Sequence, residues 1–290
     1  MEKMFLRQNI LCLIADELSV LEIDTGGRVA AGYPAEAYNY IEDRIDLNKY
    51  ILGIKDDVKY VNEKDREVYD GKNRKYIKCV WATNRNMCGE GISIGDLIVI
   101  DTNKKPHKDS IILFYIDDEF ALKRCKVYKD RIELFSIGED REPITYGGES
   151  LSRIGIVTHV VKKFPCSDNT YCGYPENAAT YVANGMDFNE YIIGDNYWET
   201  CFYLWAGGDS MSGDGITKGD LLVVDKLRDS YEDSIIVFHI NGEYTLKRIA
   251  YEKGISMLVS SNPEIRPMIY KKGTEIKRWG VLTNVIKKYK

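Results

Sequence analysis

Two residues in the C-terminal half of the chain have the side chains needed for nucleophilic catalysis without a histidine. Ser210 lies within "GGDSMSGDG" at 207–215, and Lys247 lies within "EYTLKRI" at 243–249. A serine hydroxyl becomes a useful nucleophile when a neighbouring base takes its proton, and lysine can be that base. A free lysine titrates near about 10.4, and burial can lower this pKa by roughly 3 to 5. The pair can therefore work near neutral pH only if Lys247 is buried beside Ser210.

The elements around the two residues suit this chemistry. Gly208, Asp209 and Met211 flank the serine, and glycines let main-chain N–H groups approach and hold an oxyanion. Strand alternation places Lys247 on the face opposite its two neighbours. Two other interpretations remain open, in which the serine belongs to an ordinary glycine turn and the lysine points to solvent. His239 has apolar strand neighbours, which favours a structural role for it.

The chain is a tandem repeat. The segment at 81–101, "WATNRNMCGEGISIGDLIVID", matches "WAGGDSMSGDGITKGDLLVVD" at 205–225, and three further pairs of segments match in the same order. The repeats predict an N-terminal arm at 1–26, a first domain at 27–165 and a second domain at 166–290. The first copy carries extra charged residues within 55–76, which indicate a surface loop or hairpin.

Short runs of Val, Ile, Leu, Tyr and Phe bounded by Gly, Asp and Asn dominate both copies, for example "DLLVVDKL" and "SIIVFHI". Such runs predict a mainly β fold. We expect one short helix after the Gly-Tyr-Pro segment of each copy, at 35–44 and 176–185. Hydrophobic residues at near-helical spacing in the arm predict a further short helix there.

The first copy has lost its nucleophile. Asn86 stands where the second copy has Ser210, although Lys123 matches Lys247. Thr83, Asn84 and Arg85 replace the two glycines and the aspartate. An amide cannot act as the nucleophile, so the first copy is expected to be a degenerate domain.

Composition excludes several classes of protein. A net charge of −5 gives no electrostatic case for a large DNA-binding or anionic-membrane surface. No apolar run approaches the roughly 18 residues that span a bilayer, so a cytoplasmic protein is expected. The seven cysteines and three histidines lack the spacing of metal ligands, and no metal or cofactor is expected.

The second copy resembles the LexA/UmuD family of self-cleaving serine peptidases. The resemblance is carried by "CGYP" at 172–175, "GDSM" at 208–211, "GDLLVVD" at 219–225 and "GEYTLKR" at 242–248. It implies two tandem domains built from coiled β-sheets, with Ser210 as nucleophile and Lys247 as base. It also implies that the bond cut is Cys172–Gly173. The first copy retains the Ala-Gly version of this sequence at Ala31–Gly32, which is either a second cleavage site or an inherited remnant.

The resemblance has wider implications for function. Only about 26 residues precede "GRVAAG", too few for the DNA-binding domain of LexA-type repressors, so the architecture is closer to UmuD and no sequence-specific DNA binding is expected. A role in the SOS response to DNA damage is implied, with a RecA-type filament as activator and a translesion polymerase as partner. The tandem chain resembles a dimer fused into one polypeptide. The alternatives are a non-catalytic interaction platform and a peptidase acting on separate substrates.

Overall fold

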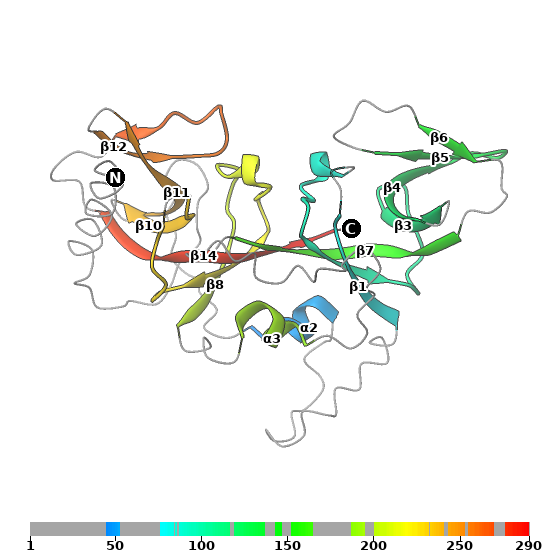
Figure 1. Ribbon diagram of the computed structural model, residues 1–290, viewed down its shortest axis with the longest axis horizontal. Helices are drawn as coiled ribbons and strands as arrows, with labels where there is room; N and C mark the ends of the chain where they lie inside the picture. Colours follow the sequence, from blue (N-terminus) through cyan, green and yellow to red (C-terminus); the bar gives the residue numbers. More distant parts are fainter. Residues whose placement is uncertain are drawn as a thin grey trace, which may run out of the picture. The chain divides into compact units, whose positions relative to one another are not determined.

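The computed structural model describes residues 45–52, 76–136, 143–146, 152–164, 187–194 and 200–289, apart from 84, 86, 117–118, 232, 241–242, 253–254 and 270–275. These residues form two compact units. The N-terminal unit comprises, of the described residues, 45–162, 187–194 and 286–289, and the C-terminal unit comprises 163–164 and 200–285. Each unit is built mainly from antiparallel strands, which confirms the mainly β prediction (Figure 1).

The strands of the N-terminal unit come mostly from the first repeat. They are β1 (Ile77–Trp81), β2 (Leu97–Asp101), β3 (Ile111–Ile116), β4 (Glu119–Val127), β5 (Ile132–Phe135), β6 (Ile144–Tyr146) and β7 (Ser152–Lys163). The pairs run β7-β3-β4-β5-β6, and β2 pairs with both β1 and β7. A short 3₁₀ turn, η2 (Cys88–Glu90), lies between β1 and β2.

The C-terminal unit repeats this plan. Its strands are β8 (Cys201–Trp205), β9 (Leu221–Asp225), β10 (Ile236–Ile240), β11 (Glu243–Glu252), β12 (Ile255–Val259), β13 (Met268–Ile269) and β14 (Ile276–Lys288), the last three residues of which belong to the N-terminal unit. The pairs run β14-β10-β11-β12-β13, and β9 pairs with β8 and β14. The turn η4 (Ser212–Asp214) corresponds to η2.

The long strands bend at matching glycines. The pairing of β3 with β7 shifts register between Leu113 and Phe114, and the pairing of β10 with β14 shifts register between Val237 and Phe238. A Cβ on Gly155 would lie 2.8 Å from Asp101 O, and one on Gly280 would lie 2.7 Å from Asp225 O. Only glycine lets the backbones cross this closely, so the repeat preserves the bulge and the residue that permits it.

Each unit has a hydrophobic core between its bent sheet and its 3₁₀ turn. In the C-terminal unit the core cluster includes Met211, Ile216, Leu246 and Val285, which are buried. Because Met211 follows Ser210 directly and Leu246 precedes Lys247 directly, this core fixes the position of both candidate catalytic residues.

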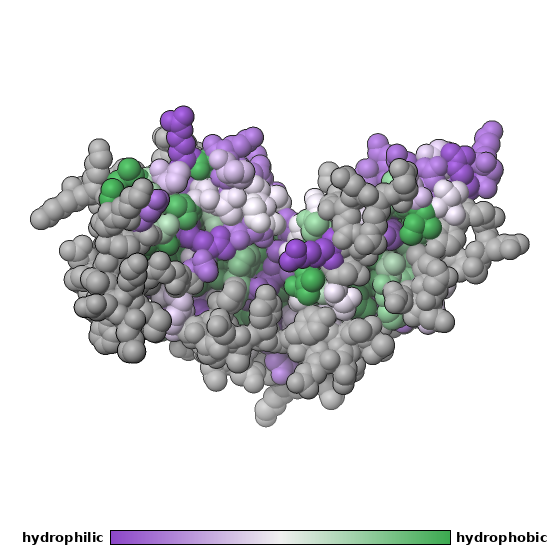
Figure 2. Space-filling model, turned by 45° about the horizontal axis from the view of Figure 1, so that its top comes forward, coloured by the Kyte–Doolittle hydropathy of each residue, from purple (hydrophilic) through white to green (hydrophobic). Residues whose placement is uncertain are grey.

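Hydrophobic side chains remain exposed where β12 pairs with β13. Ile255 and Ile269 are 47% and 55% exposed, and Ile269 pairs with Met257, two residues along the strand from Ile255. Figure 2 shows hydrophobic surface among hydrophilic residues at this end of the C-terminal unit. Small apolar patches of this kind are common on folded proteins.

Two short helices, α2 (Leu47–Leu52) and α3 (Phe188–Ile193), lie side by side in the N-terminal unit (Figure 1). They begin in the matching sequences "DLNKYI" and "DFNEYI", downstream of the segments where helices were expected. The expected helices at 35–44 and 176–185, the arm at 1–26 and nearly all of the 55–76 insertion lie outside the described residues. Among the helices that the structure describes, none has the length and hydrophobicity to cross a membrane.

Candidate active site

Ser210 lies on the connection between β8 and β9, just before η4. The connection is closed by backbone hydrogen bonds from Ala206 N to Asp220 O and from Gly219 N to Ala206 O, both 2.8 Å long. Gly215 and Gly219 adopt φ values of 76° and 92°, a region that glycine enters without strain. The glycines of this segment therefore shape the turn that holds Ser210.

The Ser210 hydroxyl is buried. The residue is 0% exposed, and within the described part of the chain its Oγ has no hydrogen-bond partner. Leaving a buried polar group unpaired is costly, and such groups in folded proteins call for an explanation. A nucleophile held ready for an incoming peptide carbonyl would provide one.

Lys247 is buried on β11, as the serine–lysine chemistry requires. Its side chain is 4% exposed, and its Nζ donates a 2.6 Å hydrogen bond to Ser260 Oγ at the end of β12. Burial lowers the pKa of the Lys247 amine below its ordinary value, because desolvation disfavours the charged ammonium. This increases the fraction of neutral amine that can accept a proton.

Residues 260–262 connect the lysine with the serine turn. Ser260 binds Lys247 Nζ, while Asn262 N donates to Ser210 O at 3.0 Å. Two residues of chain span at most about 7 Å, so the base and the nucleophile occupy neighbouring points along one short segment. No hydrogen bond joins Ser210 Oγ to Lys247 Nζ, which donates to Ser260 Oγ.

The same segment fixes the other residues of the turn. Asn262 Nδ2 donates to Asp209 O at 3.2 Å, and Asp214 N donates to Ser261 Oγ at 3.1 Å. The Asp209 carboxylate accepts a hydrogen bond from Lys218 N at 3.0 Å. Asp209 is exposed and stabilises the loop, whereas Met211 is fully buried in the core.

An ion pair ties the lysine strand to the serine turn. Arg248 follows Lys247 on β11, and its guanidinium binds both oxygens of Asp214 at 2.5 and 2.8 Å. Arg248 Nε also donates to Asp233 O at 2.9 Å. Two parallel hydrogen bonds between arginine and a carboxylate set orientation as well as distance. This pair therefore fixes β11 relative to the turn that carries Ser210.

Comparison with known proteins identifies a family. Residues 23–158 and 165–283 each match the family described as Peptidase S24-like. The chain belongs to this family. Protein ImpA of Escherichia coli is 35% identical over 121 residues, which are 41% of this chain and 80% of that protein. Protein SamA of Salmonella typhimurium is 35% identical over 116 residues, which are 40% of this chain and 79% of SamA.

A LexA repressor is also related to this S24-like chain. The protein from Anaeromyxobacter sp. (strain Fw109-5) is 30% identical over 128 residues, which are 44% of this chain and 54% of the repressor. Together with the two S24-like matches, these relatives confirm that the chain is of the LexA/UmuD type.

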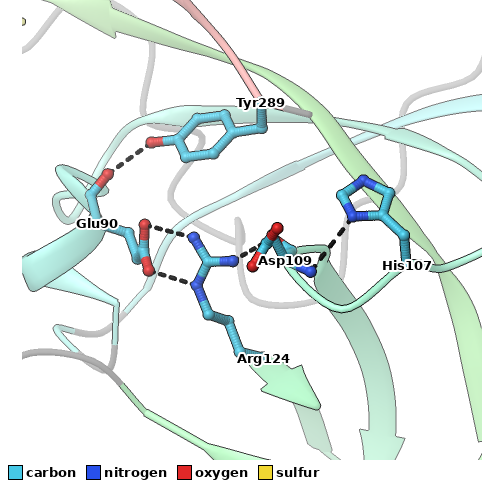
Figure 3. Close-up of polar contacts among 5 residues, drawn as sticks. All are labelled: Glu90, His107, Asp109, Arg124 and Tyr289. Carbon is cyan, nitrogen blue, oxygen red and sulfur yellow. Dashed lines mark hydrogen bonds and ion pairs between the residues drawn. The ribbon is translucent and has the colours of Figure 1, made fainter. Parts of the chain in front are cut away.

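The first S24-like repeat keeps the framework of the site. Lys123 is buried on β4 and donates a 2.5 Å hydrogen bond to Ser136 Oγ, at the same spacing of 13 residues as Lys247 and Ser260. Arg124 binds the Glu90 carboxylate at 2.5 and 2.8 Å, as Arg248 binds Asp214 (Figure 3). The ion pair and the lysine–serine contact are therefore features of the repeated fold.

The two repeats differ at hydroxyl groups. Asn86, which stands at the position of Ser210, lies outside the described residues. Thr245, two residues before Lys247 on the same face of β11, is buried, and its Oγ1 has no hydrogen-bond partner among the residues that the structure describes. Ala121 stands at its position in the first repeat. Ser210 and Thr245 of the second repeat are thus buried hydroxyls without a hydrogen-bond partner among the described residues, and Asn86 and Ala121 stand at their positions in the first repeat.

Several candidate residues from the sequence are not placed by the structure. The proposed cleavage bonds, Cys172–Gly173 and Ala31–Gly32, lie outside the described residues. The His239 ring packs against the Tyr244 ring in a tilted arrangement, with centroids 4.8 Å apart, which fits the structural role expected for it. Among the described cysteines, Cys79, Cys125 and Cys201 are buried and Cys88 is exposed.

Gly213 is close to the segment that binds the turn. A Cβ at this position would lie 2.4 Å from Ser261 O and 3.0 Å from Ser261 Cβ. We expect Gly213→Ala to lower the free energy of unfolding by about 1–3 kcal/mol, because backbone must move to admit the methyl group. Urea unfolding followed by circular dichroism measures this. Ser212→Ala in the same turn is the control, expected to change stability by less than about 0.5 kcal/mol; equal stability of the Gly213 variant and this control would contradict the prediction.

Proposed function

We propose that this S24-like chain is a self-cleaving serine peptidase in which Ser210 is the nucleophile and Lys247 the general base. The observation that carries the proposal is a buried lysine amine of lowered pKa, linked through residues 260–262 to a buried serine hydroxyl. Among the described residues this hydroxyl has no hydrogen-bond partner. The family match supports peptidase chemistry, and these side chains are suited to perform it.

The proposed reaction has two halves. The neutral Lys247 amine takes the proton from Ser210 Oγ as this oxygen attacks the carbonyl carbon of the scissile bond. Main-chain N–H groups around Gly208, Asp209 and Met211 stabilise the oxyanion. Collapse of the tetrahedral intermediate breaks the C–N bond, and the protonated lysine gives its proton to the departing amine. Water, deprotonated by the same amine, then hydrolyses the acyl-enzyme.

We propose Cys172–Gly173 as the bond cut and Ala31–Gly32 as a second candidate. Gly32 and Gly173 lie 14 residues before the matching aspartates Asp46 and Asp187. The same number of residues therefore separates each candidate bond from the helix that follows it. Mass spectrometry of the digested protein tests each bond separately. A fragment that begins at Gly173 supports the first site, and the absence of any fragment that begins at Gly32 would reduce Ala31–Gly32 to an inherited remnant.

Ser260 has a positioning role in this mechanism. A neutral amine that donates a hydrogen to Ser260 Oγ keeps its lone pair free for the Ser210 proton. Ser260→Ala should lower the maximal cleavage rate roughly tenfold, which corresponds to one hydrogen bond of about 1.4 kcal/mol. The rise of the rate with pH should also move to lower pH, because the lost acceptor had favoured the charged ammonium.

The degenerate repeat supplies the control for Ser260. Ser136→Ala removes the same hydroxyl from the contact with Lys123 and should leave both the rate and its pH profile unchanged. If the two variants behave alike, or if Ser260→Ala accelerates cleavage, Ser260 does not position the base.

We further propose that the protein acts in the cytoplasm in the SOS response. By family resemblance, a RecA-type filament on single-stranded DNA stimulates the cleavage, and the processed form assists a translesion polymerase. Adding activated RecA to the purified protein tests the first step. Faster appearance of the fragment that begins at Gly173 is the expected result.

One observation favours a second candidate function. Lys247 Nζ makes no hydrogen bond to Ser210 Oγ, so the two residues are not joined as base and nucleophile, which is compatible with a non-catalytic interaction platform. A chain that stays intact at every pH, with and without activated RecA, would favour that function.

A further inference from the structure

Each compact unit contains the end of a strand from the other repeat. Phe164, the residue after β7, belongs to the C-terminal unit, where its N donates to Thr283 O at 2.9 Å. Its side chain packs against the core cluster that contains Met211, the neighbour of Ser210. The first repeat therefore supplies part of the core beneath the candidate nucleophile.

Tyr289 makes the matching contact in the N-terminal unit. Its N donates to Thr158 O at 2.8 Å, and its ring packs against the cluster that includes Met87. Its hydroxyl donates to Glu90 O at 2.7 Å, beside the ion pair of Glu90 with Arg124 (Figure 3). The C-terminal end of the chain is thus built into the unit formed by the first repeat.

The helices α2 and α3 are joined by a reciprocal set of hydrogen bonds. Asn48 Nδ2 donates to Asp187 Oδ1 at 2.9 Å, and Asn189 Nδ2 donates to Asp46 Oδ1 at 3.0 Å. Each asparagine also accepts, at 2.8 Å, the backbone N–H that follows the opposite aspartate. Six-residue helices are unstable alone, so each helix depends on its counterpart from the other repeat.

We propose that the two pieces of the chain remain one complex after a cut in the join at 165–173. All the contacts described above connect residues before the join with residues after it, so a cut there breaks none of them. The partner of each piece is the other piece. The degenerate repeat acts as a structural subunit of the active one, because its Phe164 completes the core of the C-terminal unit. Tyr289 and α3 of the second repeat in turn form part of the N-terminal unit.

The test uses the full chain and does not depend on self-cleavage. Ser210→Ala removes the proposed nucleophile, and a recognition sequence for a site-specific protease is inserted between Asn169 and Thr170. After digestion, a denaturing gel verifies that the join is cut, and native mass spectrometry at about 1 µM gives the assembled mass. We expect one complex with the mass of the intact chain plus insert. Two separate pieces would overturn the proposal and leave the proposed peptidase activity untouched.

Variants then identify the contacts responsible. Asn48→Ala combined with Asn189→Ala should raise the dissociation constant of the nicked complex by about tenfold to a hundredfold, because each change leaves buried groups unpaired. Tyr289→Phe removes one hydroxyl and should raise the dissociation constant of the nicked complex by a smaller factor. The uncut variants are first compared by circular dichroism. If the double variant fails to fold, Tyr289→Phe still provides a test, since an unchanged dissociation constant would show that the Tyr289–Glu90 bond does not hold the pieces together.

Discussion

Replacing Ser210 by alanine should abolish cleavage of the chain, with a loss of at least about a thousandfold in rate. The change removes the attacking oxygen and leaves a methyl group in a buried site where the hydroxyl has no partner, so the fold should not suffer. Intact-mass measurements over days at alkaline pH would detect the residual rate.

Ser212→Ala is the matched control, because it removes a second hydroxyl from the same turn. It should cleave as the unchanged protein does. Cleavage of the Ser210 variant at an undiminished rate would exclude Ser210 as the nucleophile, whereas equal loss in both variants would indicate that the turn, and not the hydroxyl, had been damaged.

Replacing Lys247 by methionine should have a comparably large effect and should also remove the pH dependence. In the unchanged protein the rate should rise with pH as the Lys247 ammonium loses its proton, and then level off. Because burial lowers the pKa of Lys247, the midpoint of the rise should lie below the pH of about 10.4 at which a free lysine titrates. Methionine preserves much of the buried aliphatic chain but cannot accept a proton.

The first repeat again offers the control. Lys123→Met deletes the equivalent buried amine from the degenerate unit, and cleavage should retain its rate and its rise with pH. A rate that still rises with pH in the Lys247 variant would assign the titration to another group and contradict a lysine base.

Much of the architecture could be predicted because the same sequence pattern occurs in both repeats. The repeat predicts two β-rich copies, and Asn86 in place of Ser210 predicts that the first copy lacks a nucleophile. Burial of Lys247 is required by the proposed chemistry, but strand alternation does not predict it, because Leu246 on the opposite face of β11 is buried as well. The repeat and the replacement of Ser210 are features of local sequence, so one sequence is enough to predict them.

Contacts between distant segments could not be predicted in the same way. Ser260 reaches Lys247 because β12 pairs with β11 in the register Arg248 to Val259, which strand pattern alone does not set. A signal did exist, since a serine follows each lysine after 13 residues in both repeats. The positions of Phe164 and Tyr289 had no such signal, because repeat boundaries do not reveal that each strand end belongs to the other unit's core.

The measurement that tests the Ser–Lys mechanism most directly is incubation of the purified, unmodified chain at pH 7 and at about pH 10, with intact-mass analysis of the products. A lysine base should give a fragment beginning at Gly173 that accumulates faster at the higher pH. A chain that remains whole at both pH values, with activated RecA present, would contradict self-cleavage by Ser210 and Lys247.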